Sequence, residues 1–268
     1  MSEQKIIILG DSFAEIRPDL DYLWQHQLTK IFKTDLINIA HNGASSEWMM
    51  LKIAEYLEPN LEPDDLLVVI VPFWERVCFW PEHPDLNALF PLESIHSDWA
   101  TEPNELPPLI SKKLSYYTLE QRLAFEAYFK HLKNNDLILI KTAAMLNWIN
   151  NISSRLNTKP LIMDSHKFVE NYPINLNKCT VAKGSLFPIC EKEFSSKKVF
   201  KEYTNSGPFN DFRTGHFSEC NHNVLADKIS NYFVKNETPD LTTGFYEKII
   251  DGDIVKGKSF LQKIVNLI

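Results

Sequence analysis

KIIILGDSFAE, at residues 5–15, carries the clearest fold signal in this chain. Four of its first five residues are apolar, and a run so short and so apolar is typical of a strand buried on both faces of a parallel sheet. Gly10 permits a sharp turn, because glycine adopts positive φ angles at little cost. Asp11 and Ser12 are both favoured helix N-caps, so we expect a helix to begin here. The sequence therefore predicts a strand–turn–helix with the Ser12 hydroxyl at the carboxyl end of the first strand.

The predicted position of Ser12 suits a nucleophile. Open α/β sheets bind ligands at the carboxyl ends of their strands, and a helix N-terminus stabilises developing negative charge. A strand–turn–helix in which Asp11 and Ser12 only cap the helix is an equally good interpretation of the same residues. A serine hydroxyl also needs a base to take its proton. The choice therefore depends on which other residues the chain brings to this edge of the sheet.

Composition and charge exclude several classes of function. The 268 residues are 44% hydrophobic and 24% charged, which is typical of one large globular domain. The net charge is −7 at pH 7, so we expect neither a nucleic-acid partner nor an anionic membrane partner. Cys78, Cys179, Cys190 and Cys220 form no C-x-x-C pair, and the sequence predicts no metal site and no cofactor. Without a signal-peptide pattern or an apolar run of 18 residues, we expect a cytoplasmic protein.

Strand and helix patterns alternate along the rest of the chain. Further strands are predicted at residues 35–40, 66–71, 160–164 and 180–187, and helices at residues 20–32, 48–57, 118–132, 136–156 and 217–233. Three strand-then-helix units in succession imply right-handed crossovers and a parallel sheet. The sequence therefore predicts an α/β fold.

Two segments fall outside this alternation. Residues 77–117 form an aromatic and proline-rich insertion that is too long for a simple connection. It suits a lid or a substrate-facing loop, and a loop packed on its own core is an equally good interpretation. Residues 237–268 show helical spacing, which predicts a C-terminal helical tail that packs on the domain or mediates association. The main domain is then residues 1–236.

The segment before the last predicted helix supplies a candidate base for Ser12. His216 follows a glycine and directly precedes that helix. In an open α/β sheet this segment returns beside the first strand, so the imidazole can reach Ser12. A single histidine is more often structural than catalytic, but a histidine that follows a glycine and lies just ahead of a capped C-terminal helix is a better candidate for a base. We expect His222, farther along, to point into the helix packing.

Three blocks of sequence, taken in order, resemble the SGNH (GDSL-like) hydrolase superfamily. They are ILGDS at residues 8–12, NIAHNGAS at residues 38–45, and GHFSECNHNVLA at residues 215–226. The resemblance spans residues 5 to about 236 and implies a flavodoxin-like, three-layer α/β/α domain of about five parallel strands in the order 2-1-3-4-5. It also implies ester or amide hydrolysis through an acyl-enzyme, with Ser12 as the nucleophile and His216 as the base. Gly43 matches the glycine whose backbone N–H helps to bind the oxyanion, together with the N–H of Ser12.

The chain departs from the family pattern at two places. Where the family offers an oxyanion-binding Asn after its third strand, this chain has PFWER at residues 72–76. Arg76 could replace that amide as a donor, and a salt bridge with Glu75 is its alternative role. The family's acid normally precedes the histidine by three residues, where this chain has Arg213. Asp211 is the nearest upstream acid and a candidate third member of a triad; the alternative is a dyad whose imidazole is oriented by a backbone carbonyl.

Two hypotheses of different class follow. The first is a serine hydrolase of esterase or deacetylase type, which acts on a small-molecule or carbohydrate ester and whose aromatic insertion shapes the pocket. The second is a non-catalytic relative that keeps the fold as a carbohydrate-binding or assembly module, because the third block is altered. A fluorophosphonate probe discriminates between them, since it labels an activated serine and leaves an unactivated serine alone.

Overall fold

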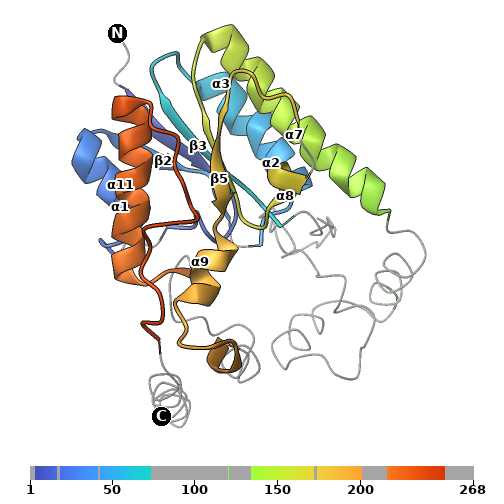
Figure 1. The fold of residues 1–268 in the computed structure, drawn as a ribbon. Coiled ribbons are helices and arrows are strands. Elements are labelled where there is room, and N and C mark those ends of the chain that lie inside the picture. Colours follow the sequence, from blue (N-terminus) through green and yellow to red (C-terminus); the bar gives the residue numbers. More distant parts are fainter. Residues whose placement is uncertain are drawn as a thin grey trace.

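A five-stranded parallel sheet forms the centre of the fold (Figure 1). The computed structural model describes residues 4–16, 19–41, 43–73, 120, 134–171, 174–200 and 216–250. The strands are β1 (Lys5–Leu9), β2 (Asp35–Asn38), β3 (Leu66–Val71), β4 (Leu161–Asp164) and β5 (Thr180–Ser185). Their order is β2-β1-β3-β4-β5, and every neighbouring pair is parallel. The predicted α/β class, strand number and strand order are confirmed.

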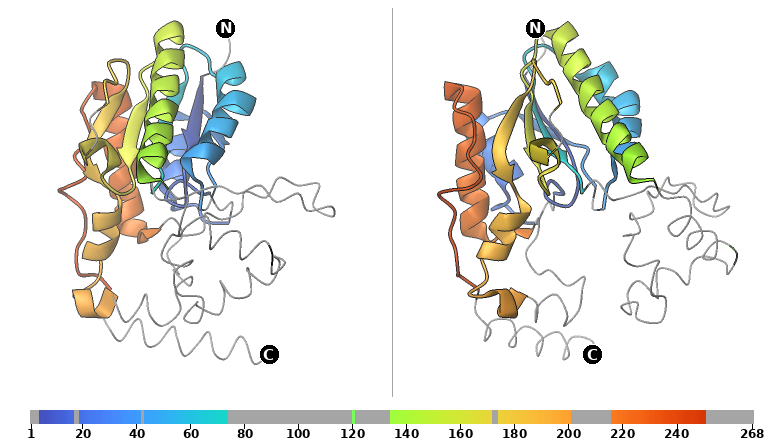
Figure 2. Two further views of the ribbon diagram at one scale, coloured as in Figure 1. Left: turned by 90° about the vertical axis from the view of Figure 1, so that its right-hand side faces the viewer. Right: turned by 45° about the vertical axis from the view of Figure 1, so that its right-hand side comes forward.

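Helices cover both faces of the sheet, which makes the three predicted layers (Figure 2). On one face α1 (Trp24–Phe32) packs against α11 (Glu219–Lys235). On the other face α2 (Ser46–Lys52) packs against α7 (Asn135–Leu156). Shorter described helices include the π-helix η1 (Ile53–Leu57), α3 (Glu58–Asn60), α8 (Phe168–Asn171) and α9 (Phe187–Lys192). No described helix is both long enough and apolar enough to cross a membrane.

The apolar residues of β1 explain why this strand lies at the centre. Ile6 and Ile8 belong to the hydrophobic cluster under α1 and α11, whereas Ile7 and Leu9 belong to the cluster under α2 and α7. All four side chains are completely buried. Burying one such side chain contributes roughly 1.5–3 kcal/mol. A strand with apolar residues on both faces is therefore stable only between two layers of helices.

The chain after Ser12 differs from the expectation. Residues 12–14 form a turn, and the first described helix, α1, begins only at Trp24. The prediction that a helix begins at Asp11 and Ser12 was wrong, because the carbonyl and the carboxylate of Asp11 close a turn instead. The Ala14 N–H donates to the Asp11 carbonyl over 2.9 Å, and the Phe13 N–H donates to Asp11 Oδ1 over 3.1 Å. Support for negative charge at Ser12 cannot come from a helix that begins there.

Two predicted segments lie partly or wholly outside the described residues. The insertion at residues 77–117 lies outside them, as does all of the helix predicted at 118–132 except Glu120. In the C-terminal tail, residues 237–250 contain turns and isolated bridges, so the helix expected there is absent. Backbone pairing of this stretch with β5 replaces helical hydrogen bonds: the Lys183 N–H donates to the Pro239 carbonyl and the Leu241 N–H to the Lys183 carbonyl. The remainder of the predicted tail, residues 251–268, lies outside the described residues.

Candidate active site

Ser12 and His216 meet at the carboxyl edge of the sheet, although 204 residues separate them in sequence. The distance between His216 Nε2 and Ser12 Oγ is 2.7 Å. An imidazole nitrogen at this distance can accept the hydroxyl proton, provided that the ring carries its own proton on Nδ1. Ser12 is buried, with only 6% of its surface exposed. The sequence predicts that these two residues form a nucleophile–base pair, and the distance between them is compatible with those roles.

The close approach of β3 explains the glycine before Asp11. A Cβ on Gly10 would lie 2.7 Å from Ile70 Cβ, which is closer than Cβ atoms in proteins approach other atoms, and 3.0 Å from Ala14 Cβ, which is a tight contact. Gly10 is not among the residues with positive φ. Glycine is therefore needed here for lack of space, and the positive φ expected from the sequence is not the reason.

Long-range hydrogen bonds fix the turn that carries Ser12. The indole Nε1 of Trp24, in α1, donates to the Phe13 carbonyl over 3.0 Å. The side-chain amide of Asn38, at the end of β2, donates to the Ala14 carbonyl over 2.7 Å. These bonds anchor the two residues that follow Ser12 to separate elements of the domain. The serine hydroxyl is thereby held in one place without a helix of its own.

The carboxylate of Asp11 joins the ends of three strands. Asp11 is completely buried. Its Oδ2 accepts a hydrogen bond of 3.1 Å from the hydroxyl of Ser165, the residue after β4. Ser165 also contacts β3, because its N–H donates to the Val71 carbonyl over 3.0 Å. Sequence reasoning missed Ser165, since no motif marks it and only the pairing of β3 with β4 brings it to Asp11.

His216 occupies an unusual backbone conformation. Its φ is 66°, in the left-handed region, which costs a residue other than glycine roughly 1–2 kcal/mol. Its ring packs against Phe13, the neighbour of Ser12, with 4.7 Å between the ring centroids. The ring centroids of Phe217 and Phe13 lie 5.5 Å apart. The Phe13 ring therefore helps to position the imidazole. The unfavourable backbone conformation of His216 must be held by contacts elsewhere in the domain.

His222 has the structural role expected of it. Its residue is completely buried, and its Nδ1 accepts a hydrogen bond of 3.3 Å from the Trp24 N–H. This bond caps the first turn of α1 from α11 and joins the two helices. His216 is therefore the histidine that contacts Ser12, and His222 lies between α1 and α11.

Gly43 lies in the turn that follows β2, with a φ of 75°. The His41 N–H in this turn donates to the Gly10 carbonyl over 3.1 Å, which places the turn next to the segment leading to Ser12. The role of the Gly43 N–H toward an oxyanion stays a prediction. Arg76 and Asp211 lie outside the described residues, so their predicted roles stay predictions as well.

An acid at the same sheet edge, Asp164, serves a neighbouring helix. Its Oδ2 accepts a hydrogen bond of 2.7 Å from the Val169 N–H in the first turn of α8. Burial raises the pKa of this carboxyl from 3.8 to about 7, and the α8 backbone N–H groups oppose the rise only in part. Within the described ranges, no group of three or more His, Cys, Asp and Glu side chains could hold a metal ion.

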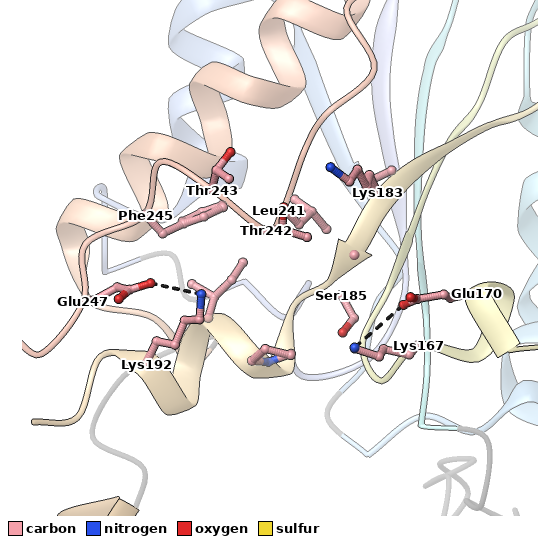
Figure 3. Close-up of a pocket in the computed structure, with 14 residues that line it drawn as sticks. Lys167, Glu170, Lys183, Ser185, Lys192, Leu241, Thr242, Thr243, Phe245 and Glu247 are labelled. Atoms are coloured by element: carbon pink, nitrogen blue, oxygen red, sulfur yellow. Dashed lines mark ion pairs between the residues drawn. The ribbon is translucent and has the colours of Figure 1, made fainter. Parts of the chain in front are cut away.

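A cavity of about 450 Å³ lies beside β5 and is separate from the Ser12–His216 pair (Figure 3). Its apolar wall includes Ile189, Leu241 and Phe245. Its lysines are matched by acids: Lys192 lies 3.0 Å from Glu247, and Lys183 and Lys167 pair with Asp240 and Glu170. Neither Ser12 nor His216 lines this cavity, which does not contribute to the candidate active site.

Comparisons with known proteins add little to this geometry. No protein-family model matches the sequence, and no curated protein matches it. Among solved structures, the chain is similar to a proposed lipolytic protein of the G-D-S-L family from Desulfitobacterium hafniense DCB-2, with 10% identity and a TM-score of 0.30. The match covers 86% of this chain and 99% of that chain. A likeness this weak assigns neither a family nor an activity, so function has to be inferred from the chain's own residues.

Proposed function

We propose that this chain is a serine hydrolase of esterase or deacetylase type, with Ser12 as the nucleophile and His216 as the base. The observation that carries the proposal is the 2.7 Å contact between Ser12 Oγ and His216 Nε2 at the carboxyl edge of a parallel sheet. A serine hydroxyl is a weak nucleophile unless a base takes its proton. Open α/β sheets bind their ligands at this edge.

The proposed reaction has two steps, and the same imidazole moves the proton in both. In the first, Ser12 Oγ attacks the ester carbonyl while Nε2 takes the hydroxyl proton; Nε2 then protonates the departing alcohol oxygen, and the acyl group remains on Ser12. In the second, water loses a proton to Nε2 and attacks the acyl carbonyl, and Ser12 Oγ recovers the proton as the acid leaves. The sum is one ester and one water converted to one acid and one alcohol.

Three further residues belong to this proposal as predicted from the sequence. The N–H groups of Ser12 and Gly43 stabilise the oxyanion, and Arg76 supplies the donor that replaces the family's Asn. A single oxyanion donor contributes about 3 kcal/mol in subtilisin, so the replacement matters for turnover. Asp211 orients His216. The substrate class is a small-molecule or carbohydrate ester.

A fluorophosphonate probe tests the proposal directly. We expect the purified protein to gain one probe per chain, located at Ser12 by mass spectrometry of the peptides. Ser12→Ala should abolish the labelling, and His216→Ala should slow it at least 100-fold, since general-base assistance contributes about 10²–10⁴. Ser230→Ala is a matched control, because the Ser230 hydroxyl donates within its own helix, to the Asp227 carbonyl. A folded protein that takes no label would refute the hydrolase and support the non-catalytic module.

A further inference from the structure

The buried carboxylate of Glu193 contacts the segment that follows His216. Glu193 follows α9 and is completely buried. Its Oε1 accepts the Ser218 N–H over 2.9 Å and the side-chain amide of Asn221 over 2.6 Å, and it lies 2.5 Å from Ser218 Oγ. A carboxylate is costly to bury unless hydrogen bonds satisfy it, and bonds to a charged acceptor are stronger than neutral ones. This cluster is therefore a firm attachment between α9 and the start of α11.

The acceptor that Glu193 supplies replaces the usual cap of α11. Ser218 is the N-cap residue of that helix, yet its side chain makes no capping bond to it. The hydroxyl contacts Glu193 instead. A negative group at a helix N-terminus is favoured by the helix dipole and by the N–H groups that lack intrahelical partners. The position of the α11 N-terminus is thus set by a residue from another element.

The C-terminal stretch holds this cluster from the other side. The Asn221 side chain donates to the Tyr246 carbonyl over 3.0 Å and accepts the Tyr246 N–H over 2.8 Å. The Ile250 N–H donates to the Glu193 carbonyl over 2.8 Å. Figure 3 shows the Lys192–Glu247 ion pair that joins the same stretch to α9. Glu193 is therefore fixed at its backbone as well as at its carboxylate.

Only Phe217 separates Ser218 from His216, whose left-handed φ of 66° is unfavourable on its own. We propose that Glu193 is a positioning residue: by holding Ser218, it holds the His216 backbone in that conformation and keeps Nε2 2.7 Å from Ser12 Oγ. This inference rests on the proposed function, in which the contact is catalytic. A misplacement of about 1 Å in an active site can cost 10²-fold in rate, so the attachment matters for turnover far more than for substrate binding.

The test compares Glu193→Ala and Glu193→Gln with a control in the adjacent residue. We expect Glu193→Ala to lower kcat and the rate of fluorophosphonate labelling by roughly 10- to 100-fold with little change in KM, since substrate binding is not its role. Glu193→Gln keeps an oxygen for the Ser218 N–H and should lose less than tenfold. Lys192→Ala removes a half-exposed ion pair to the same stretch and should change neither rate more than twofold. A role in stability alone would lower the melting temperature and leave kcat and labelling of the folded protein unchanged.

A second readout keeps the inference separate from the hydrolase proposal. In a spectrum of ¹⁵N-labelled histidines, we expect Glu193→Ala to shift or broaden the His216 ring signals and Lys192→Ala to leave them in place. Should Glu193→Ala fail to fold, Ser218→Ala takes its place, because it removes the hydroxyl contact and keeps the backbone N–H bond. If wild-type protein takes no label, the proposed function fails, and the spectrum still decides on Glu193. His216 signals unchanged in the folded variants would overturn the positioning role.

Discussion

Replacing Asp164 with asparagine should change how the stability of this protein depends on pH. Asp164 is buried at the end of β4, and burial raises its pKa from 3.8 to about 7. Below about pH 4 the carboxyl is protonated in both the folded and the unfolded chain, so it adds no pH dependence there. Between pH 4 and 7 the unfolded chain loses the proton and the folded chain keeps it, so the free energy of unfolding falls as pH rises.

The size of this fall follows from the two pKa values. A difference of one pKa unit corresponds to 1.36 kcal/mol, so the rise from 3.8 to about 7 corresponds to about 4 kcal/mol between pH 4 and pH 8. An asparagine side chain at this position would keep an oxygen for the Val169 N–H and cannot ionise. We therefore expect Asp164→Asn to gain about 4 kcal/mol relative to wild type over that range, whatever offset the two proteins show at pH 4.

Urea denaturation followed by tryptophan fluorescence at half-unit steps from pH 4 to pH 8 measures both curves. Asp240→Asn is a control whose stability relative to wild type should not change between pH 4 and pH 8. The Thr242 hydroxyl and Lys183 lower the pKa of Asp240, so its contribution is present above about pH 4 and is lost on acidification. Curves for wild type and Asp164→Asn that stay parallel within about 1 kcal/mol would refute the reasoning, because the buried carboxyl would then titrate like an exposed one.

Three further predictions concern the surroundings of the candidate site. Gly10→Ala should lower the free energy of unfolding by about 1–3 kcal/mol in urea denaturation, because the new Cβ would lie 2.7 Å from Ile70 Cβ. An unchanged free energy of unfolding would mean that β3 moves aside at little cost. His222→Ala leaves the first N–H of α1 without its acceptor and should lower the free energy of unfolding by about 1–3 kcal/mol. The fluorophosphonate labelling rate of the folded variant should stay at the wild-type value, and a large loss of labelling would show that His222 takes part in the site. Asp211→Asn should lower kcat by about 10⁴-fold if Asp211 is the third member of a triad, as in the trypsin example; a loss below tenfold would indicate a dyad.

Much of the fold could be predicted from local sequence. The apolar residues of β1 and β3 face a hydrophobic cluster on each side of the sheet, and such double burial leaves a continuous apolar run that is readable without a structure. The helical spacing before and after these runs then sets the α/β order. The pairing of Ser12 with His216 was predictable for a similar reason, since Ser12 follows a recognisable strand and His216 precedes a recognisable helix, and an open α/β sheet brings both positions to one edge.

Local sequence patterns predicted the wrong secondary structure where a segment could form hydrogen bonds with more than one partner. Asp11 and Ser12 are good helix caps, yet the Asp11 carboxylate instead bonds the Phe13 N–H and the Ser165 hydroxyl. The stretch at 237–250 has helical spacing, yet its backbone pairs with Lys183 in β5. In both cases contacts between distant segments outweigh a weak local preference.

The α/β class and the choice of the serine and histidine that share an edge were readable from the residues, because they depend on apolar runs and on the general geometry of parallel sheets. How that pair is held became visible only when the layers were packed together. Ser165 reaches Asp11 across 154 residues, and Glu193 reaches Ser218 across 25. Neither contact leaves a pattern in the sequence, because a buried hydrogen bond requires only that two polar groups meet, and the packing of the whole domain brings them together.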